Sequence, residues 1–468
     1  MSATPRPWRP ALILTIACAA LLALTLDGAQ LERVKAKGLR RSSTVLASVA
    51  NAAPPAGPLL RPPAAGGFSP QVRLGFTAGD QWEPAIAADR LGHVYVLYPQ
   101  YLGVPGCPPE ECASPTMILQ RSADHGASWS APTILYRPGA AGGQWDAQIV
   151  VDPQDGRTVF ASWLQNGKSD TVVAKSTDFG ATWTVVTAEH TNAGTDKPIL
   201  AVRGQAVAVV FNHAQKIWAA VSRDGGLTFT QAQINPNGKL GWALSGGGTI
   251  TSAGLFFAWA GYEQNGGAKG NVNLFVSRSA DGGQTWTTQV LDVSKAPPDC
   301  SAYHCGWAYL GAQMVLAADQ AGGLYALWNA NSVDKGPNRV YFARSTDGGL
   351  TWSPKSEVST APAGRQHAFP ALAAGAAGDV RVAWMDTRAG TLWNTFYRSS
   401  TDGGRTWSAE ADLATYVAGY TYIAADGFSF PFGDYFEMDL DERGTAHVVW
   451  GEALNYDTPG SIWYAAGR

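Results

Sequence analysis

The chain has 468 residues, of which 46% are apolar, and it contains 18 Trp and 53 Gly. This content supplies a large buried core and excludes an intrinsically disordered chain. Only 15% of the residues are charged and the net charge is −3, so the sequence lacks the basic surface of a nucleic-acid-binding protein and we expect no nucleic-acid partner.

Residues 1–29 have the composition of an export segment. Arg6 and Arg9 precede an uncharged apolar run at 11–26. This run suits the apolar region of a signal peptide better than a full membrane span, which takes about 20 residues. No clean cleavage motif follows, so an uncleaved N-terminal membrane anchor is the alternative. Either interpretation predicts a secreted or extracytoplasmic protein.

Residues 30–69 are rich in Pro, Ala and Gly and show no apolar periodicity. This composition predicts a solvated linker, which would tether the rest of the chain to a membrane if the anchor is retained. The remaining residues, 70–468, alternate Val, Thr, Trp and Tyr with Gly-rich turns. We therefore expect a single all-β domain, acting as a monomer.

Four cysteines of this domain form two close pairs, Cys107 with Cys112 and Cys300 with Cys305. Export makes two local disulfides plausible. Zinc binding by the four thiols is the alternative, but the spacing is not a usual ligand pattern. We expect disulfides and no bound metal or cofactor.

A hairpin pattern recurs along the domain. Each copy is a strand, a turn built on Asp or Gly, and a second strand that ends in an aromatic residue. The seven copies lie at 83–98, 146–163, 197–211, 247–260, 312–328, 369–384 and 435–450.

An octet of the form S-x-D-x-G-x-[ST]-[WF] follows six of these hairpins. Repeats of this length predict an array or a propeller. After the seventh hairpin the sequence reaches residue 468 where the octet would begin, so the missing outer strand is expected from residues 71–76. This gives a β-propeller of seven four-stranded blades closed by an N-terminal strand, and six blades are the alternative. The octets lie at 122–129, 176–183, 222–229, 279–286, 345–352 and 400–407.

The octet resembles the Asp-box, or bacterial neuraminidase repeat, of sialidase-like β-propellers, and the resemblance covers residues 70–468. In such a turn the Asp and Ser side chains cap backbone amides, Gly takes a positive φ, and Trp packs between blades. The Asp of each box is therefore predicted to be structural rather than catalytic.

Propeller ligands usually bind at one mouth of the central channel, where the innermost strands begin. Carboxylates interleaved with aromatic side chains at these positions suit a sugar. The alternative is that these acids only cap strands. For a glycosidase we expect the catalytic residues among Asp434, Asp146, Glu83 and Tyr435, with Asp434 and Asp146 as the first pair. Substrate-binding candidates are Trp82, Trp145, Asp196, Lys197, Trp307, His367 and Arg388.

Catalytic sialidases clamp the substrate carboxylate with three arginines and pair a Tyr with a Glu. The resemblance implies that Tyr435 and Glu437 are an available Tyr/Glu pair. However, Trp82 stands where the first family arginine is expected, so sialic-acid hydrolysis is not predicted. The leading hypothesis is an exported glycoside hydrolase with a carboxylate pair at the channel mouth. The alternatives are a non-catalytic propeller that binds glycan or protein at the cell surface, and a purely structural tethered protein.

Overall fold

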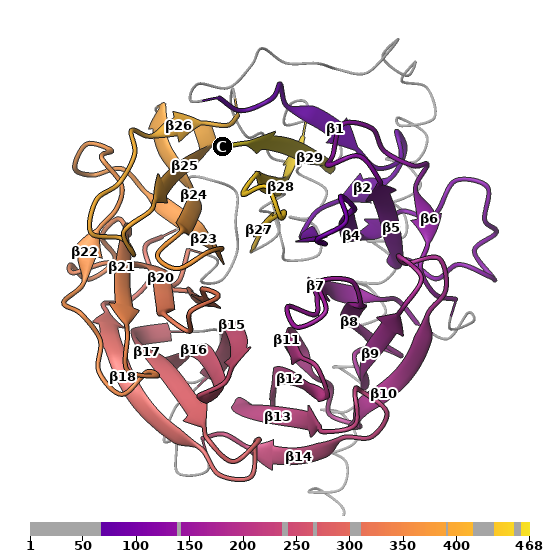
Figure 1. The fold of residues 1–468 in the computed structure, drawn as a ribbon, viewed down its shortest axis with the longest axis horizontal. Helices are drawn as coiled ribbons and strands as arrows, with labels where there is room; N and C mark the ends of the chain where they lie inside the picture. The colour runs from indigo at the N-terminus through magenta and orange to yellow at the C-terminus, as the bar shows by residue number, and fades with distance from the viewer. Residues whose placement is uncertain are drawn as a thin grey trace, which may run out of the picture. The chain divides into compact units, whose positions relative to one another are not determined.

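The computed structural model describes strands, turns and loops that form one ring of β-sheets (Figure 1). The predicted all-β class is confirmed. Among the described residues, no helix is long and apolar enough to cross a membrane. The export segment and most of the linker lie outside the described residues, as do Cys300, Cys305, Trp307 and Asp434. The structure describes residues 67–137, 142–235, 242–264, 269–299, 310–389, 392–414, 435–453 and 460–468.

The described strands form seven sheets, so the prediction of seven blades is confirmed. Blade 1 contains β2 (Asp80–Gln81), β3 (Ala85–Ala88), β4 (Val94–Tyr101), β5 (Thr116–Ser122) and β6 (Thr133–Ile134). Blade 2 contains β7 (Trp145–Val151), β8 (Val159–Gln165), β9 (Asp170–Ser176) and β10 (Thr184–His190). Blade 3 contains β11 (Asp196–Arg203), β12 (Ala206–His213), β13 (Lys216–Ser222) and β14 (Thr230–Gln233).

The same order repeats in the remaining blades. Blade 4 contains β15 (Trp242–Thr251), β16 (Gly254–Gln264), β17 (Lys269–Ser279) and β18 (Thr287–Ser294). Blade 5 contains β19 (Met314–Ala318), β20 (Leu324–Ala330), β21 (Arg339–Ser345) and β22 (Ser356–Glu357). Blade 6 contains β23 (His367–Ala374), β24 (Val380–Ala389), β25 (Leu392–Ser400) and β26 (Ala411–Asp412). Blade 7 contains β27 (Glu437–Leu440), β28 (Ala446–Ala453), β29 (Gly460–Gly467) and β1 (Val72–Leu74).

The ring closes through β1, which pairs antiparallel with β29, with Val72 opposite Tyr464. This confirms the predicted N-terminal closing strand. Closure begins earlier than predicted, because Phe68 and Ser69 also contact blade 7. Phe68 is buried in the core between blades 6 and 7, and the backbone N–H of Ser69 donates to the Ala466 carbonyl at 2.7 Å. Phe68 and Ser69, which were predicted to lie in the linker, therefore contribute to ring closure.

The hydrophobic core lies between blades, and each cluster of buried side chains draws on neighbouring sheets. The box residue Trp352 is half-buried and packs against a cluster that includes Phe256 of blade 4 and Leu324 of blade 5. The aromatic residue of each of the other octets packs against such a cluster in the same way. Large aromatic side chains thus hold successive blades together.

The Asp-boxes connect the third and fourth strands of six blades. In the box of blade 5 the Ser345 hydroxyl donates to Asp347 Oδ1 at 2.7 Å, and Asp347 Oδ2 accepts the Thr351 hydroxyl at 2.5 Å. The same bonds recur in the other five boxes. Hydrogen bonds from the hydroxyl and backbone N–H of the box Ser or Thr lower the pKa of the six carboxyl groups. The Asp carboxylates therefore stabilise the box turns by accepting hydrogen bonds, as predicted.

Candidate functional site at the channel mouth

One position in every blade lies just before the innermost strand or within its first residues, and in five blades the residue at this position lines the central cavity. In several blades the innermost strand carries an irregularity here, with register shifts in β7, β11, β15 and β23. A bulge changes the direction in which a side chain points. Four non-glycine residues at this position have a positive φ of 49–57°, a strained conformation that clusters at functional sites. The seven equivalent residues are Glu83, Asp146, Lys197, Gly246, Gln313, Phe369 and Tyr435.

Three of these residues form a buried charged cluster. Lys197 Nζ lies 3.0 Å from Asp146 Oδ1 and 3.3 Å from Glu83 Oε1. The two carboxylate oxygens contact one ammonium group, so they can be no further apart than the sum of these distances. Their side chains are only 4% and 3% exposed, whereas that of Lys197 is 13% exposed. Two buried carboxylates therefore share one ammonium group.

Lys168 extends this cluster from the loop between β8 and β9. Its Nζ lies 2.7 Å from Asp196 Oδ1 and 3.8 Å from Asp146 Oδ2. Burial alone would raise the pKa of Asp146, but the ammonium groups of Lys197 and Lys168 outweigh burial and lower this pKa to about 2. Asp146 is therefore ionised at neutral pH.

Tyr435 adds an aromatic wall to the mouth. Lys197 Nζ lies 4.9 Å from the centroid of its ring, and its hydroxyl donates to the Ala147 carbonyl at 3.3 Å. Aromatic rings offer an apolar face to the C–H groups of a sugar.

Two carboxyl groups on β27 line the channel next to Tyr435. Burial raises the pKa of Glu437 to about 8 and that of Asp439 to about 6. The Ile86 N–H donates to Glu437 at 3.2 Å, and the Gln148 side-chain amide also donates to Glu437. Both residues are half-buried, and both line the cavity. Glu437 is thus a protonated carboxylic acid at neutral pH.

The mouth opens into a cavity of about 320 Å³. Asp146 and Lys197 line it from blades 2 and 3, whereas Tyr435 and Glu437 line it from the opposite end of the chain. The cavity therefore brings together an ionised carboxylate, a protonated carboxyl group, a cation and an aromatic ring.

The other predicted residues are placed differently. Trp82 is buried and stacks on Tyr101, with ring centroids 4.5 Å apart. Trp145 is half-buried beside Asp146. Asp196 lies one residue before the mouth position of blade 3 and joins the cluster, where it pairs with Lys168 and contacts Asp146.

His367 and Arg388, which were predicted to bind substrate, have partners within blade 6, and their role in substrate binding stays a prediction. His367 is fully buried and its Nε2 lies 2.8 Å from the Ser359 hydroxyl. Its backbone pairs with Asp386 inside blade 6, two residues before the mouth position. Arg388 forms ion pairs with Asp386 and Glu410, each at 2.6 Å, so its guanidinium is occupied.

Sequence reasoning missed Lys168 and Gln148 and gave Glu437 no separate role. Lys168 belongs to no motif, since it lies in a short loop. Glu437 follows Tyr435 by two residues, so strand alternation predicts that both side chains lie on the same face. This alternation was the sequence signal that could have placed Glu437 at the site.

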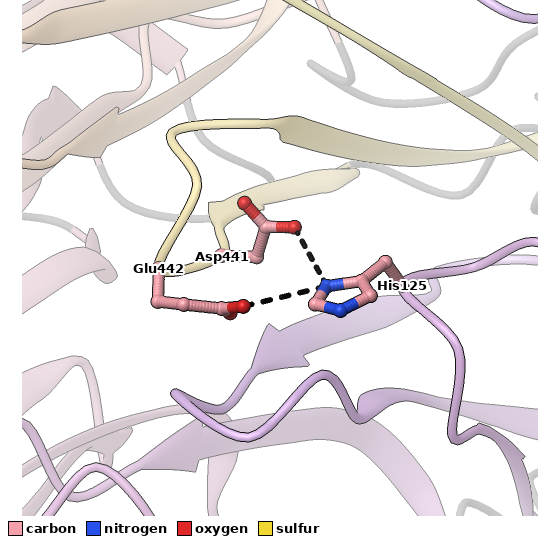
Figure 2. Close-up of side chains that lie close together, drawn as sticks. All are labelled: His125, Asp441 and Glu442. Carbon is pink, nitrogen blue, oxygen red and sulfur yellow. Dashed lines mark hydrogen bonds and ion pairs between the residues drawn. The ribbon is translucent and has the colours of Figure 1, made fainter.

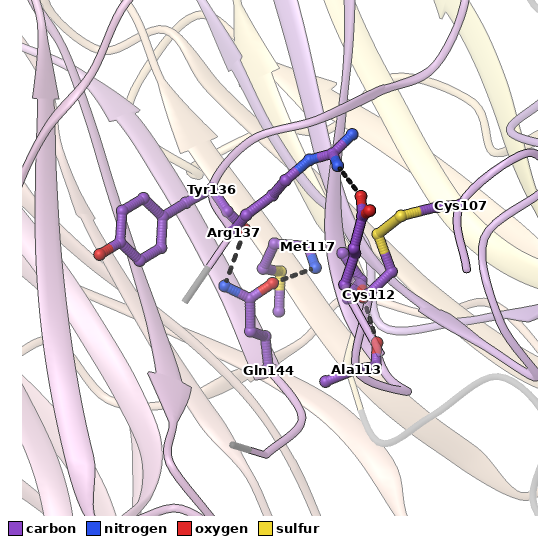
Figure 3. The surroundings of a disulfide bond; sticks show 9 residues. Cys107, Cys112, Ala113, Met117, Tyr136, Arg137 and Gln144 are labelled. Atoms are coloured by element: carbon purple, nitrogen blue, oxygen red, sulfur yellow. Dashed lines mark hydrogen bonds and ion pairs between the residues drawn. A yellow bond between two sulfur atoms is a disulfide. The ribbon is translucent and has the colours of Figure 1, made fainter. Parts of the chain in front are cut away.

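The disulfide between Cys107 and Cys112 is formed, with Cα atoms 6.0 Å apart, and this predicted pair is confirmed. Figure 3 shows the disulfide near Arg137. Arg137 Nη1 lies 3.1 Å from Glu111 Oε2. The bond staples the loop between β4 and β5. This loop lies at the same end of the blade as the mouth position, because β4 runs antiparallel to β3.

The fold and the repeats define the class of protein: the chain is a seven-bladed β-propeller whose Asp-box turns resemble the BNR repeats of sialidase-like propellers. The BNR repeat-like domain matches residues 78–308. Over 265 residues the chain is 28% identical to a xyloglucanase from Paenibacillus sp., and this match covers 50% of the chain and 23% of that enzyme.

Similar solved structures include proteins of several activities. A protein of unknown function from Dyadobacter fermentans is 15% identical with a TM-score of 0.47, over 83% of this chain and 94% of that one. An ulvan lyase is 12% identical with a TM-score of 0.48, and the match covers 83% of this chain and 95% of that one. The sialidase NanB from Streptococcus pneumoniae is 14% identical with a TM-score of 0.42, and the match covers 85% of this chain and 70% of that one.

Proposed function

We propose that this propeller is an exported glycoside hydrolase that binds a glycan at the channel mouth and cleaves a glycosidic bond there. One observation carries the proposal: the cavity is lined by two carboxyl groups whose environments shift their pKa values in opposite directions. Asp146 is held ionised by two lysines, and Glu437 is held protonated by burial. Carboxyl groups that differ in this way perform the acid and base steps of glycoside hydrolysis.

The roles follow from these protonation states. Glu437 has a proton to give to the glycosidic oxygen as the bond to the leaving group breaks. Asp146 either attacks the anomeric carbon or takes a proton from the attacking water. Lys197 keeps Asp146 ionised, and the ring of Tyr435 stacks on the sugar.

The sequence-based pair of Asp434 and Asp146 stays a prediction. Asp434 lies outside the described residues and immediately precedes Tyr435, which lines the cavity. Glu437 is the described carboxyl group best suited to the acid role, and Asp434 is its rival. The similarity to a xyloglucanase supports a glycan as the substrate class.

A non-catalytic glycan-binding propeller is the second candidate. It is favoured by the ion pairs that already occupy Glu83 and Asp146, since a paired carboxylate is poorly placed to attack a substrate.

A panel of neutral polysaccharides and chromogenic glycosides separates the two candidates. We expect release of reducing ends by the parent protein and loss of release in Glu437→Gln. Glu111→Gln, which changes an exposed acid on the disulfide loop, is the control and is expected to retain activity. Glycan binding without release by the parent protein would favour the binding protein, and neither binding nor release would overturn the proposal.

A further inference from the structure

A second cluster of ligand-type side chains lies at the opposite end of the blades from the mouth. It joins the Asp-box of blade 1 to the turn between β27 and β28 of blade 7. Figure 2 shows the His125 imidazole pointing at the carboxylates of Asp441 and Glu442, which come from the other segment. His125 Nδ1 lies 3.2 Å from Asp441 Oδ2 and 3.7 Å from Glu442 Oε1.

These spacings match the coordination sphere of a metal ion. One donor atom from each of the three residues lies within 4.8 Å of the other two. In a tetrahedral site with bonds of about 2.0–2.1 Å, neighbouring ligand atoms are about 3.3 Å apart. The contact between His125 and Asp441 already has this length, so only Glu442, whose side chain is 30% exposed, needs to move.

Asp441 is held in place to present one oxygen. Its Oδ1 accepts the backbone N–H groups of Arg443 and Thr445 at 2.9 and 2.8 Å. Its side chain is only 1% exposed, so the carboxylate is fixed by the turn. Oδ2 is the atom that faces His125.

A buried histidine points at the same oxygen independently. His447 is fully buried, and its Nε2 lies 3.4 Å from Asp441 Oδ2 without forming a hydrogen bond. Its Nδ1 is 2.7 Å from the Tyr464 hydroxyl. If that hydroxyl donates to Nδ1, then Nε2 carries the proton and faces Asp441 as the outer-shell partner that metal-ligating carboxylates usually have.

From this arrangement we propose that His125, Asp441 and Glu442 bind a divalent transition-metal ion of the Zn²⁺ class. One nitrogen and two carboxylate oxygens form a three-ligand set of the kind that Zn²⁺ accepts, with water in the fourth position. Ca²⁺ prefers six or more oxygen ligands, so it fits this set poorly. Because the ligands come from blades 1 and 7, the ion would hold the first and last blades together and stabilise the closed ring.

The variant that removes the proposed histidine ligand is His125→Gly. Four of the other boxes have glycine at this position, and His125 itself has a φ of 60°, so glycine suits the backbone. His190→Ala is the control, because it removes an exposed histidine that pairs with Asp170 at 2.5 Å outside this cluster.

The test uses the untagged full chain after chelator treatment, with Zn²⁺ binding followed by titration calorimetry and thermal unfolding. We expect the parent protein and His190→Ala to bind one more equivalent of Zn²⁺ than His125→Gly, and Zn²⁺ to raise the melting temperature only in the first two. Ca²⁺ should leave all three melting temperatures unchanged. Two results would overturn the proposal. One is an equal Zn²⁺ stoichiometry in the parent protein and His125→Gly. The other is a rise in the melting temperature of the parent protein with Ca²⁺ that equals its rise with Zn²⁺.

Discussion

Removing the closing strand should destabilise the propeller severely. We compare a chain that begins at Gly67 with one that begins at Thr77. The shorter chain loses the burial of Phe68 and Leu74, which are 4% and 3% exposed. Each buried side chain of this size contributes about 1.5–3 kcal/mol. It also loses the two hydrogen bonds between Ser69 and Ala466 and the pairing of β1 with β29, at about 1 kcal/mol per hydrogen bond.

The expected loss is about 6–10 kcal/mol, which is comparable to the whole stability of many folded domains. The assay is urea unfolding followed by circular dichroism and Trp fluorescence. Leu74→Ala in the longer chain perturbs β1 less than its removal does, and it should lower the free energy of unfolding by about 2–4 kcal/mol. Equal unfolding midpoints for the two chain lengths would refute the role of β1 in closure.

Four further predictions concern the box, the mouth, the substrate and the rival acid. Trp352→Ala should lower the free energy of unfolding by about 2 kcal/mol, since this ring is only half-buried, without changing glycan affinity; an unchanged unfolding curve would contradict its role between blades. Glu437 holds its proton in the folded state from pH 4.5 to about 8, so stability should fall as pH rises through this window, and Glu437→Gln should flatten that dependence in pH-dependent melting curves. Fluorogenic sialosides should not be cleaved, because Trp82 stands where the family arginine is expected; release that Tyr435→Phe abolishes would show this wrong. Asp434→Asn tests the rival acid, and we expect it to retain turnover if Glu437 is the acid.

Most of the fold could be predicted because its repeats are local. Each hairpin and each box is specified within about 20 residues by alternation and turn chemistry. The closing strand was predicted from one missing outer strand. The contribution of Phe68 was not, because a single aromatic residue after a Pro-rich segment gives no periodic pattern. Its burial depends on blades 6 and 7, which lie far away in the sequence.

The candidate site could be predicted in part. Glu83, Asp146 and Lys197 occupy equivalent positions, so the repeat itself indicated that they converge. His367 lies two residues before this position in blade 6 and is fully buried, and its predicted role in binding stays a prediction. Lys168 comes from a loop between strands, and only the folded blade shows that it reaches Asp146.

Asp146→Asn tests the central claim most directly. Asn keeps the shape of the side chain but cannot carry the negative charge that the base or nucleophile requires. We expect reducing-end release from the glycan that the parent protein cleaves to fall by at least about 100-fold, while the affinity for that glycan stays nearly unchanged. The melting temperature should fall as well, because Lys197 and Lys168 lose a buried ion-pair partner. Full activity in this variant would contradict a carboxylate mechanism at the channel mouth, and a loss of glycan affinity as large as the loss of release would assign Asp146 to binding rather than to catalysis.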